Sequence, residues 1–344
     1  MKKIYLIRAN KNIFGGAENY LSRISRQLKL NNIDYEIIYS KFPMFLPSWF
    51  RVFVFNIQLS IFKGNRFYFS LDRISSADVY RAGDGVHKEF LKIKKKSKLN
   101  PLHPLYLNLE KKCFVNSQKI IVNSNMVKNQ ILHNYNINED KIRIVYNGFD
   151  PEKLSYSKSF IKISKEFNIT ENEFILLFVG SGFKRKGVSN FLNIVSQLNQ
   201  ENIKAFVIGK DSNLESYKKL AKKLLIDKKI FFTGPRSDVN DFYKIGDIFI
   251  FPTHYEPFSN VVLEAMAYGN AIFTTKQNGA SEIIDPEYIM NSPRDETVIK
   301  KINNLLENDS LLSKVKNKNK EVSAKFSVEK NVTETLRILN EVIN

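Results

Sequence analysis

Short runs of β-branched and aromatic residues alternate with helical patterns along almost the whole chain. The apolar runs are Lys3–Arg8, Tyr35–Tyr39, Arg66–Ser70, Asp78–Ala82, Lys119–Asn123, Lys141–Asn147, Phe174–Gly180, Ala205–Gly209, Ile230–Gly234, Ile248–Thr253, Ala271–Thr275 and Glu287–Met290. The helical patterns are Ala17–Leu30, Ser124–Asn134, Val188–Leu198, Leu214–Leu225, Asn260–Tyr268 and Asp295–Glu307. Strands that alternate with helices form parallel sheets covered on both faces. We therefore expect an α/β fold.

The alternation runs through two sets of segments, which indicates two domains. Gly148-Phe149-Asp150-Pro151 and a polar stretch over residues 152–172 separate the sets. We expect a domain over residues 1–150 and a second over 151–344, each a doubly wound, Rossmann-like parallel sheet. Facing each other, they would leave a cleft at the carboxyl ends of their strands, where such sheets bind ligands. The final helix, Ser327–Ile343, is expected to pack on either domain.

Net charge is unevenly distributed along the chain. The formal net charge is +18, and residues 1–150 carry 25 Lys and Arg against 11 Asp and Glu. This excess favours an anionic partner for the first half: nucleic acid, a membrane surface or a phosphorylated substrate. Charge alone does not choose among these three classes.

Cysteine content and hydropathy indicate the cellular compartment in which the protein is expected. The single cysteine, Cys113, excludes an internal disulfide framework and a thiolate zinc site. Residues 1–8 have the pattern of a first strand and lack a signal-peptide cleavage site. Without an uncharged apolar run of about 18 residues, we expect no membrane span and a cytoplasmic protein.

A strand, a loop and a helix start follow one another at residues 251–264. Ser259 is a favourable N-cap, so the backbone N–H groups of Asn260 and Val261 would be open to a phosphate at the helix N-terminus. Glu256 and Glu264 are eight residues apart, which is about 12 Å if both are helical. Retaining glycosidases need about 5–5.5 Å between their carboxylates. The pair suits a two-point grip on an elongated ligand; the alternative is two surface acids on a solvated helix.

Two glycine-containing loops follow strands. Gly180-Ser-Gly-Phe-Lys-Arg-Lys-Gly187 lets the backbone approach a ligand, and Lys184, Arg185 and Lys186 can neutralise a diphosphate. It is not a Walker loop, because Val188 stands where a lysine would be required. Gly15-Gly16 follows the first strand and opens the first helix. For both loops the structural alternative is a simple turn.

A third group of candidate residues lies at the carboxyl end of the apolar run Asp78–Ala82. Arg81, Asp84 and His87 lie close together there and are candidates for acid–base chemistry or substrate orientation, although a lone histidine is more often structural. The aromatic stretch at residues 42–69 has helical spacing and is expected mainly in the core. Together with the basic run Lys92–Lys98, it is the candidate for docking at an anionic lipid surface.

Taken in order along the chain, these motifs resemble the retaining glycosyltransferases of family 4, which have the GT-B fold. The motifs are Gly15-Gly16-Ala17-Glu18, Asn123-Ser-Asn with Lys141–Gly148, Gly182–Gly187 and Glu256-x7-Glu264. The Arg81–His87 stretch further resembles transferases that build the core of lipopolysaccharide or lipooligosaccharide.

The resemblance implies that the domain over residues 1–150 binds the acceptor and that the domain over residues 151–344 binds the nucleotide sugar. It also implies a role for each matching residue. Glu264 would hold the ribose hydroxyls, and Glu256 would hold the donor-sugar hydroxyls together with the backbone of Phe258, Ser259, Asn260 and Val261. Arg185 and Lys186, with Lys184, would take the diphosphate, and Gly15 and Gly16 would approach it. Arg236 would border the base, and Asp84 and His87 would lie near the donor sugar and the acceptor hydroxyl.

The implied activity is transfer of a sugar from a nucleotide-diphosphate sugar, expected to be a UDP-sugar, to a glycolipid or oligosaccharide acceptor. A front-face mechanism with retention is expected, as is independence of metal, because the chain has no Asp-x-Asp triad. Ser181 stands where many family members have arginine, so Lys184 or Arg185 must supply that charge.

Two expectations concern partners. We expect weak association with the anionic inner-membrane surface, and we expect no nucleic-acid partner. The alternatives are a nucleotide-sugar epimerase or phosphorylase on the same fold, or a non-catalytic basic protein that binds membranes or nucleic acid.

Overall fold

The computed structural model describes residues 3–10, 16–43, 45–93 and 100–343. By internal contacts the chain forms two units, one of residues 1–147 with 328–344 and the other of residues 148–327. The last helix therefore belongs to the N-terminal unit. Most of the basic run Lys92–Lys98 lies outside the described residues.

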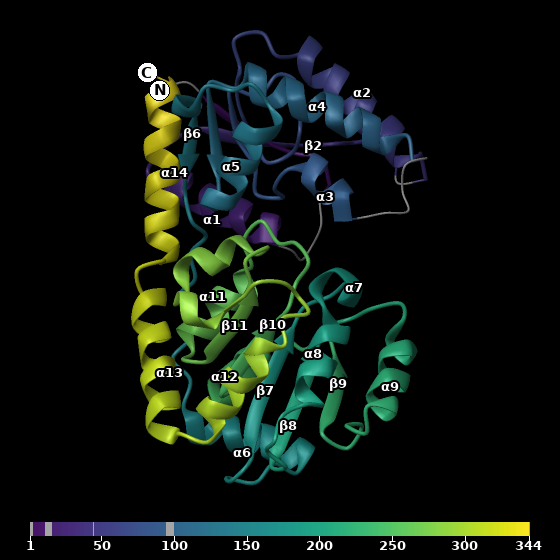
Figure 1. Ribbon diagram of the computed structural model, residues 1–344. Coiled ribbons are helices and arrows are strands. Elements are labelled where there is room, and N and C mark those ends of the chain that lie inside the picture. The colour runs from purple at the N-terminus through teal and green to yellow at the C-terminus, as the bar shows by residue number, and fades with distance from the viewer. Residues whose placement is uncertain (1–2, 11–15, 44, 94–99, 344) are drawn as a thin grey trace. The chain divides into compact units, whose positions relative to one another are not determined.

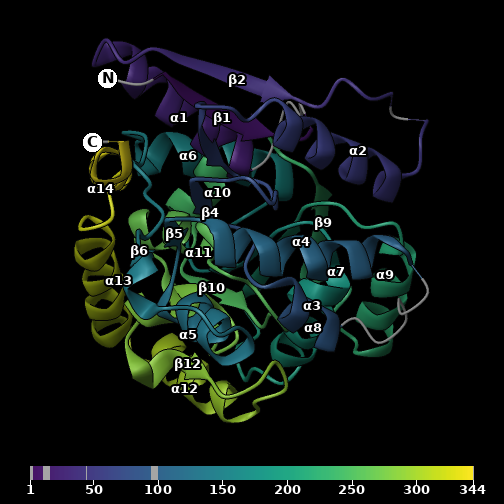
Figure 2. The same cartoon turned by 90° about the horizontal axis from the view of Figure 1, so that it is seen from above.

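The N-terminal unit contains a six-stranded parallel sheet in the order β2-β1-β3-β4-β5-β6 (Figures 1 and 2). Its strands are β1 (Ile4–Arg8), β2 (Tyr35–Tyr39), β3 (Phe67–Ser70), β4 (Val79–Arg81), β5 (Lys119–Val122) and β6 (Ile142–Ile144). Its helices are α1 (Gly16–Leu30), α2 (Ser48–Ile61), α3 (His87–Ile93), α4 (Leu102–Asn116), α5 (Asn125–Asn134) and α14 (Val328–Ile343), and η1 (Glu139–Lys141) is a 3₁₀ turn.

The C-terminal unit contains a second six-stranded parallel sheet in the order β12-β11-β10-β7-β8-β9. Its strands are β7 (Phe174–Val179), β8 (Ile203–Ile208), β9 (Ile230–Gly234), β10 (Ile248–Phe251), β11 (Ala271–Thr275) and β12 (Ile289–Met290). Its helices are α6 (Tyr156–Phe167), α7 (Phe183–Lys186), α8 (Val188–Val195), α9 (Leu214–Lys223), α10 (Val239–Ile245), α11 (Asn260–Ala267), α12 (Thr297–Leu306) and α13 (Asp309–Ser323), with 3₁₀ turns η2 (Gly279–Ile283) and η3 (Pro286–Tyr288). The predicted α/β class is confirmed, and each predicted strand is present.

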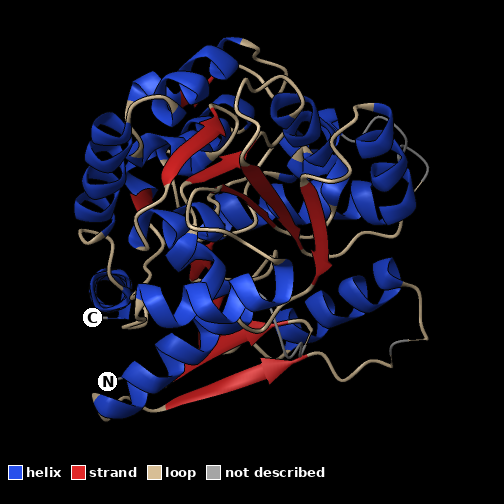
Figure 3. Ribbon diagram, turned by 90° about the horizontal axis from the view of Figure 1, so that it is seen from below, coloured by secondary structure: helices blue, strands red, loops and turns tan. Residues whose placement is uncertain are grey.

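Helices lie on both sides of the strands in each unit (Figure 3). In the N-terminal sheet successive side chains point to opposite faces. Leu6 packs with α1 and α14 in one core cluster, whereas its neighbour Ile7 packs with Phe55 of α2 in the other. Because the sheet is buried on both faces, its strands are continuous apolar runs.

The sequence-based expectations differ from the local structure in two places. Residues 152–172 were expected only as a polar stretch that separates the two domains, with no helix predicted there, but they contain α6, with Ile163 fully buried. Its apolar side chains at positions 156, 160, 163 and 167 follow helical spacing. The aromatic stretch was expected mainly in the core, but Trp49, Phe53 and Phe62 are exposed. Only one face of α2 packs on the sheet.

Candidate functional site

Both sheets have a topological switch point, where neighbouring strands send their following loops in opposite directions. In the C-terminal sheet it lies between β7 and β10, since the chain moves outward to β8 and β9 and then crosses to β10. In the N-terminal sheet it lies between β1 and β3. Ligands of open parallel sheets bind at such points, outside the carboxyl ends of the strands.

The loop after β7 is shaped by two glycines. A Cβ atom on Gly180 would lie 2.7 Å from Cδ of Lys186, so the glycine lets the lysine fold back over the loop. A Cβ atom on Gly187 would lie 1.9 Å from the carbonyl oxygen of Pro252, just after β10. Both glycines have positive φ, which other residues adopt at a cost. The loops after β7 and β10 are thereby brought against each other.

Charged side chains join these two loops. Arg185 Nη1 donates to Glu256 Oε1 and also to the carbonyl oxygen of Tyr255 at 2.8 Å. Lys186 Nζ lies 3.4 Å from the same Glu256 oxygen, and the Arg185 carbonyl accepts from the His254 N–H at 2.9 Å. Lys184 is exposed and is not one of the cations paired with Glu256. The two cations exceed the one carboxylate by a single positive charge, which favours an anionic ligand.

The loop carrying Glu256 continues into the N-terminus of α11. Ser259 occupies the N-cap position, but its side chain makes no capping hydrogen bond, contrary to the capping role expected from the sequence. Its Oγ is buried and, among the described residues, has no hydrogen-bond partner.

His254 lies in the loop that carries Glu256. Burial lowers the pKa of His254, and the positive charge of Arg294 lowers it further. The imidazole is therefore held in its neutral form near neutral pH.

Asn278 supports this loop from a neighbouring segment, and sequence reasoning missed that function. Its Oδ1 accepts from the Ser259 N–H at 3.2 Å and the Ala280 N–H at 3.1 Å, while its Nδ2 donates to Thr274 Oγ1. The side chain is fully buried. Its only signal in the sequence is an asparagine next to Gly279, a common turn pattern.

Glu264 lies within α11, about one turn beyond the helix N-terminus. Its Oε2 accepts a hydrogen bond from the Tyr243 hydroxyl at 3.1 Å. Burial, followed by the charge of Glu264, raises the pKa of Tyr243 well above its ordinary value. Tyr243 therefore remains a hydrogen-bond donor and orients the Glu264 carboxylate.

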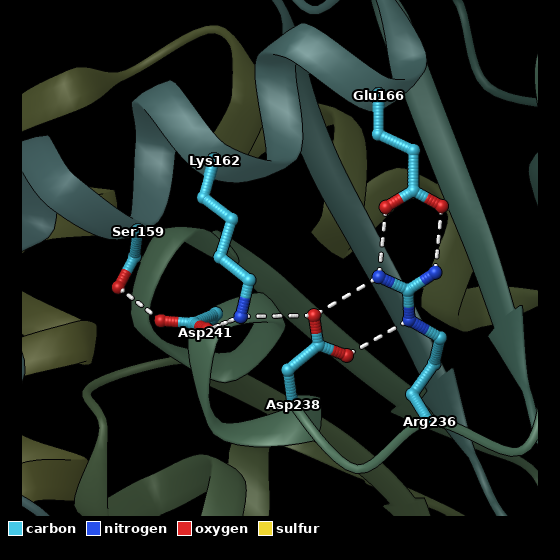
Figure 4. Close-up of polar contacts among 6 residues, drawn as sticks. All are labelled: Ser159, Lys162, Glu166, Arg236, Asp238 and Asp241. Atoms are coloured by element: carbon cyan, nitrogen blue, oxygen red, sulfur yellow. Dashed lines mark hydrogen bonds and ion pairs between the residues drawn. The ribbon is translucent and has the colours of Figure 1, made fainter.

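Arg236 follows β9 and is held by carboxylates on both sides (Figure 4). Nη1 and Nη2 bond to Glu166 at 2.6 and 2.7 Å, and Nε and Nη2 bond to Asp238 at 2.8 and 2.9 Å. Hydrogen bonds from Arg236 lower the pKa of Asp238 to about 2, so the pair stays ionised. Lys162 extends the network by bridging Asp238 and Asp241. The guanidinium thus links α6 to the turn after β9, and a contact with a nucleotide base stays a prediction.

The predicted residues of the N-terminal unit have different environments. Asp84 is exposed in the loop after β4. His87, the first residue of α3, is buried, and its Nε2 lies 3.1 Å from Nδ1 of His103. Gly16 opens α1 and is exposed, whereas Gly15 lies outside the described residues. The catalytic role of Asp84 and His87 stays a prediction, and Asp84 has the more accessible side chain.

A buried carboxylate organises the surroundings of His87. Glu110, fully buried on α4, accepts from Arg73 Nε at 2.8 Å, the His87 N–H at 2.7 Å and the Tyr135 hydroxyl at 2.6 Å. Sequence reasoning did not single out Glu110, because an acid within a helix has no local mark of burial. Among the described residues, no group of three or more His, Cys, Asp or Glu has an arrangement that could hold a metal ion.

Two family models match the chain. The model for glycosyl transferases group 1 matches residues 159–322, and the model for glycosyltransferase family 4 matches residues 81–153. Each match lies largely within one of the two units.

Curated relatives point in the same direction. The lipopolysaccharide glucosyltransferase WaaG of Escherichia coli is 30% identical over 44% of this chain and 41% of its own. The lipopolysaccharide 1,2-N-acetylglucosaminetransferase of Salmonella typhimurium is 32% identical over 49% of this chain and 47% of its own. The match spans only 47%, 38% and 61% of the length of three other curated relatives.

Solved structures match over nearly the full length and establish the fold. The crystal structure of WaaG has a TM-score of 0.82 and 18% identity, covering 97% of this chain and 99% of that one. HepE of Anabaena, solved with UDP and glucose, has a TM-score of 0.75 and 16% identity, covering 99% and 100%. At these identities the likeness shows the fold and not the substrate.

Proposed function

Because the chain belongs to the glycosyltransferases of group 1 and family 4, with the GT-B fold, we propose that it moves a sugar from a UDP-sugar to a glycolipid or oligosaccharide acceptor. The observation that carries this proposal is the junction of Arg185, Lys186 and Glu256 at the switch point of the C-terminal sheet. Cations for a diphosphate and a carboxylate for sugar hydroxyls meet there. The lipopolysaccharide relatives support synthesis of a lipopolysaccharide core or another surface glycan.

In this proposal the diphosphate, the sugar and the ribose of the donor each have a partner in the C-terminal unit. The diphosphate is bound by Arg185 and Lys186 and by the first N–H groups of α11, whose dipole favours an anion. Glu256 accepts hydrogen bonds from the sugar hydroxyls. Glu264, oriented by Tyr243, accepts from the ribose.

The proposed mechanism is front-face displacement with retention. The acceptor hydroxyl oxygen bonds to the anomeric carbon as the bond from that carbon to the diphosphate oxygen breaks. The departing diphosphate takes the hydroxyl proton, so no protein nucleophile and no metal is required. Arg185 and Lys186 stabilise the negative charge that develops on the leaving group.

Nucleotide binding tests this proposal directly. We expect UDP, and not GDP, ADP or CMP, to bind in isothermal calorimetry, with the same affinity in EDTA as in magnesium. Glu264→Ala should weaken UDP binding at least tenfold, because hydrogen bonds to a charged acceptor are worth about 1.5–3 kcal/mol. Glu321→Ala, an exposed acid on α13, is the matched control. If none of the four nucleotides binds, the transferase proposal is wrong and a non-catalytic function becomes the better hypothesis.

Peripheral membrane association is part of the proposal, and α2 is the surface that supports it. Trp49, Phe53, Ile57 and Ile61 follow one another at four-residue intervals on this helix and are between 39% and 71% exposed. The opposite side of α2 is anchored in the core through its own buried apolar side chains. Contiguous exposed apolar surface of this kind marks an interaction site.

Charge favours an anionic lipid surface as the partner. Residues 37–71 contain four basic residues and no acidic one. Lys41 and Arg66, at the two ends of this segment, are exposed. A helix with exposed aromatic side chains and neighbouring cations suits the interface of an anionic bilayer. Among the described residues, no helix is long and apolar enough to cross that bilayer.

Vesicle binding tests the role of α2. We expect the protein to sediment with phosphatidylglycerol vesicles and not with phosphatidylcholine vesicles. Phe53→Ser with Ile57→Ser should reduce binding at least tenfold, since each buried side chain contributes about 1.5–3 kcal/mol. Ile161→Ser on α6, which is 65% exposed, should leave it unchanged. Equal binding by the double variant, or a dimer in analytical ultracentrifugation that this variant dissociates, would contradict the membrane assignment.

A further inference from the structure

Three residues other than glycine have a positive φ angle among the described residues, and each lies at the C-terminal end of a helix. They are Asn32 after α1, Asn168 after α6 and Leu225 after α9, with φ of 53°, 51° and 56°. After α9 the Leu225 N–H donates to the Lys222 carbonyl at 3.0 Å, and the next N–H donates to the Ala221 carbonyl at 3.0 Å. This is a Schellman cap, whose left-handed position favours glycine or asparagine. Leucine is the exception among the three.

The side chain of Leu225 is 88% exposed. A single exposed leucine needs no explanation by itself. Here, however, the exposed leucine also occupies a left-handed position, where its Cβ atom crowds the backbone and asparagine would cost less. Neither the exposure nor the strain stabilises the unit. An apolar side chain presented in this way points to a function other than folding.

Lysines cover the outer face of α9, directly before this leucine. Lys218, Lys219, Lys222 and Lys223 are all exposed and follow one another at helical spacing. Lys218 lies 2.8 Å from Glu215 in the first turn of the helix. Among the described residues, the ammonium groups of the other three lysines have no hydrogen bond or ion pair within the protein. Their charge is therefore available to a partner.

The charge of this half of the chain is concentrated around the same turn. Residues 151–344 carry 28 Lys and Arg against 24 Asp and Glu, and outside residues 214–229 the counts are 22 and 22. The segment 214–229 thus holds the whole excess, with six lysines against two acidic residues. Lys228 is exposed on the other side of Leu225, and Asp227 is the one acid in residues 216–229.

This turn lies at the edge of the sheet opposite the donor residues. Because α9 joins the parallel strands β8 and β9, its C-terminus lies beside their amino-terminal ends, and the Ala205 N–H donates to the Lys229 carbonyl there at 2.8 Å. Figure 1 shows α9 on the outer side of the unit, next to β9. A partner at this turn leaves the loops at the carboxyl ends of the strands uncovered.

We propose that the C-terminal turn of α9 is a second contact with an anionic lipid surface, in which Leu225 inserts among the acyl chains and the surrounding lysines bind the phosphates of the headgroups. A nucleic acid fits less well, because it would leave Leu225 in water. The side chains that stack on bases are aromatic, and Tyr217, the one aromatic residue in 214–230, is buried. The proposal extends the membrane association proposed for α2 to the other unit and does not depend on the sugar-transfer reaction.

A tryptophan at the turn would measure insertion directly. Trp49 is the only tryptophan of the chain, so Leu225→Trp in a Trp49→Phe background places a single fluorophore there. With phosphatidylglycerol vesicles we expect its emission maximum to shift to shorter wavelength and its emission to be quenched by brominated acyl chains. Ile161→Trp on α6, at a position 65% exposed, should show neither effect in the same background. An unshifted spectrum for Leu225→Trp would overturn the proposal, whether or not the protein sediments with the vesicles.

A second variant avoids any uncertainty about folding. Leu225→Asn should keep or raise the midpoint of thermal unfolding, because asparagine suits the left-handed position. The same variant should weaken binding of the full chain to phosphatidylglycerol vesicles at least tenfold, the effect of withdrawing one buried leucine.

Combined lysine variants test the charge. Lys219→Gln, Lys222→Gln and Lys223→Gln together should also weaken vesicle binding at least tenfold at low salt. The matched control changes three exposed lysines elsewhere in the unit, Lys314→Gln, Lys320→Gln and Lys325→Gln, and should leave binding unchanged. Equal losses in the two triple variants would show that net charge alone is responsible and would overturn the assignment to α9.

The remaining outcomes separate this proposal from the others. Vesicle binding that is unchanged in both Leu225→Asn and the α9 triple variant would overturn it. Loss of binding to an RNA or DNA duplex in the triple variant, with vesicle binding intact, would overturn it in favour of a nucleic-acid partner. All these variants should bind UDP as the parent protein does, so failure here would leave the transfer reaction standing, and Phe53→Ser with Ile57→Ser tests α2 separately.

Discussion

Replacing Glu256 by glutamine is expected to reduce the turnover number for sugar transfer by about 10²–10³, the usual effect of removing one preorganised electrostatic contact from an active site. The carboxylate is the common partner of Arg185 and Lys186. Glutamine keeps the shape but removes the charge that holds the two cations between the loops after β7 and β10. Both the sugar contact and the placement of the diphosphate cations would suffer.

Steady-state kinetics with a UDP-sugar donor would measure this effect. Glu321→Gln, an exposed substitution of the same chemistry on α13, should retain full activity. Lys186→Ala should also cut turnover heavily, and combining it with Glu256→Gln should cost less than the sum of the separate effects, because the two groups act as a unit. A rate near that of the parent protein for Glu256→Gln would refute its role in the donor site.

Replacing Glu110 by alanine is expected to lower the free energy of unfolding of the N-terminal unit by about 3–5 kcal/mol. The carboxylate is fully buried and accepts hydrogen bonds from Arg73, from the His87 backbone and from Tyr135. Its removal leaves the Arg73 guanidinium, whose side chain is 10% exposed, without its carboxylate. A buried charge without a partner is among the most destabilising changes a protein can undergo.

Urea unfolding followed by hydrogen exchange and mass spectrometry would resolve this loss within the N-terminal unit. Asn108→Ala, an exposed change on the same helix, should alter stability by less than about 0.5 kcal/mol. Glu110→Gln should fall between the two, because the amide oxygen still accepts a hydrogen bond. A loss below about 1 kcal/mol for Glu110→Ala would show that the network does not stabilise the unit.

Local patterns in the sequence predicted the strands well for a physical reason. A strand in the middle of a parallel sheet is covered on both faces, so its whole length must be apolar, as in Phe174–Val179. The same patterns failed for α2. Its aromatic residues fill both sides of the helix, so periodicity could not say which side faces the sheet. For α6, the apolar side chains have helical spacing, but the polar composition of the surrounding stretch made this pattern hard to recognise.

Charged residues show the limit of sequence reasoning most clearly. Lys184, Arg185 and Lys186 are equivalent as a basic triplet, yet the structure brings only the last two to Glu256. Arg236 has the charge expected of a ligand-binding residue, but its guanidinium is occupied by Glu166 and Asp238. A side chain's partner depends on which loops meet in space, and that is set by strand order.

The sequence by itself determined the α/β class, the positions of the strands, the glycine loop at residues 180–187 and the paired acids Glu256 and Glu264, because each leaves a periodic or closely spaced local signature. Only the tertiary structure decided which cations pair with Glu256, that α2 exposes an apolar face and that Glu110 is buried beside Arg73. These features join residues far apart in the chain. Their geometry follows from the strand order around each switch point, which no local stretch of sequence encodes.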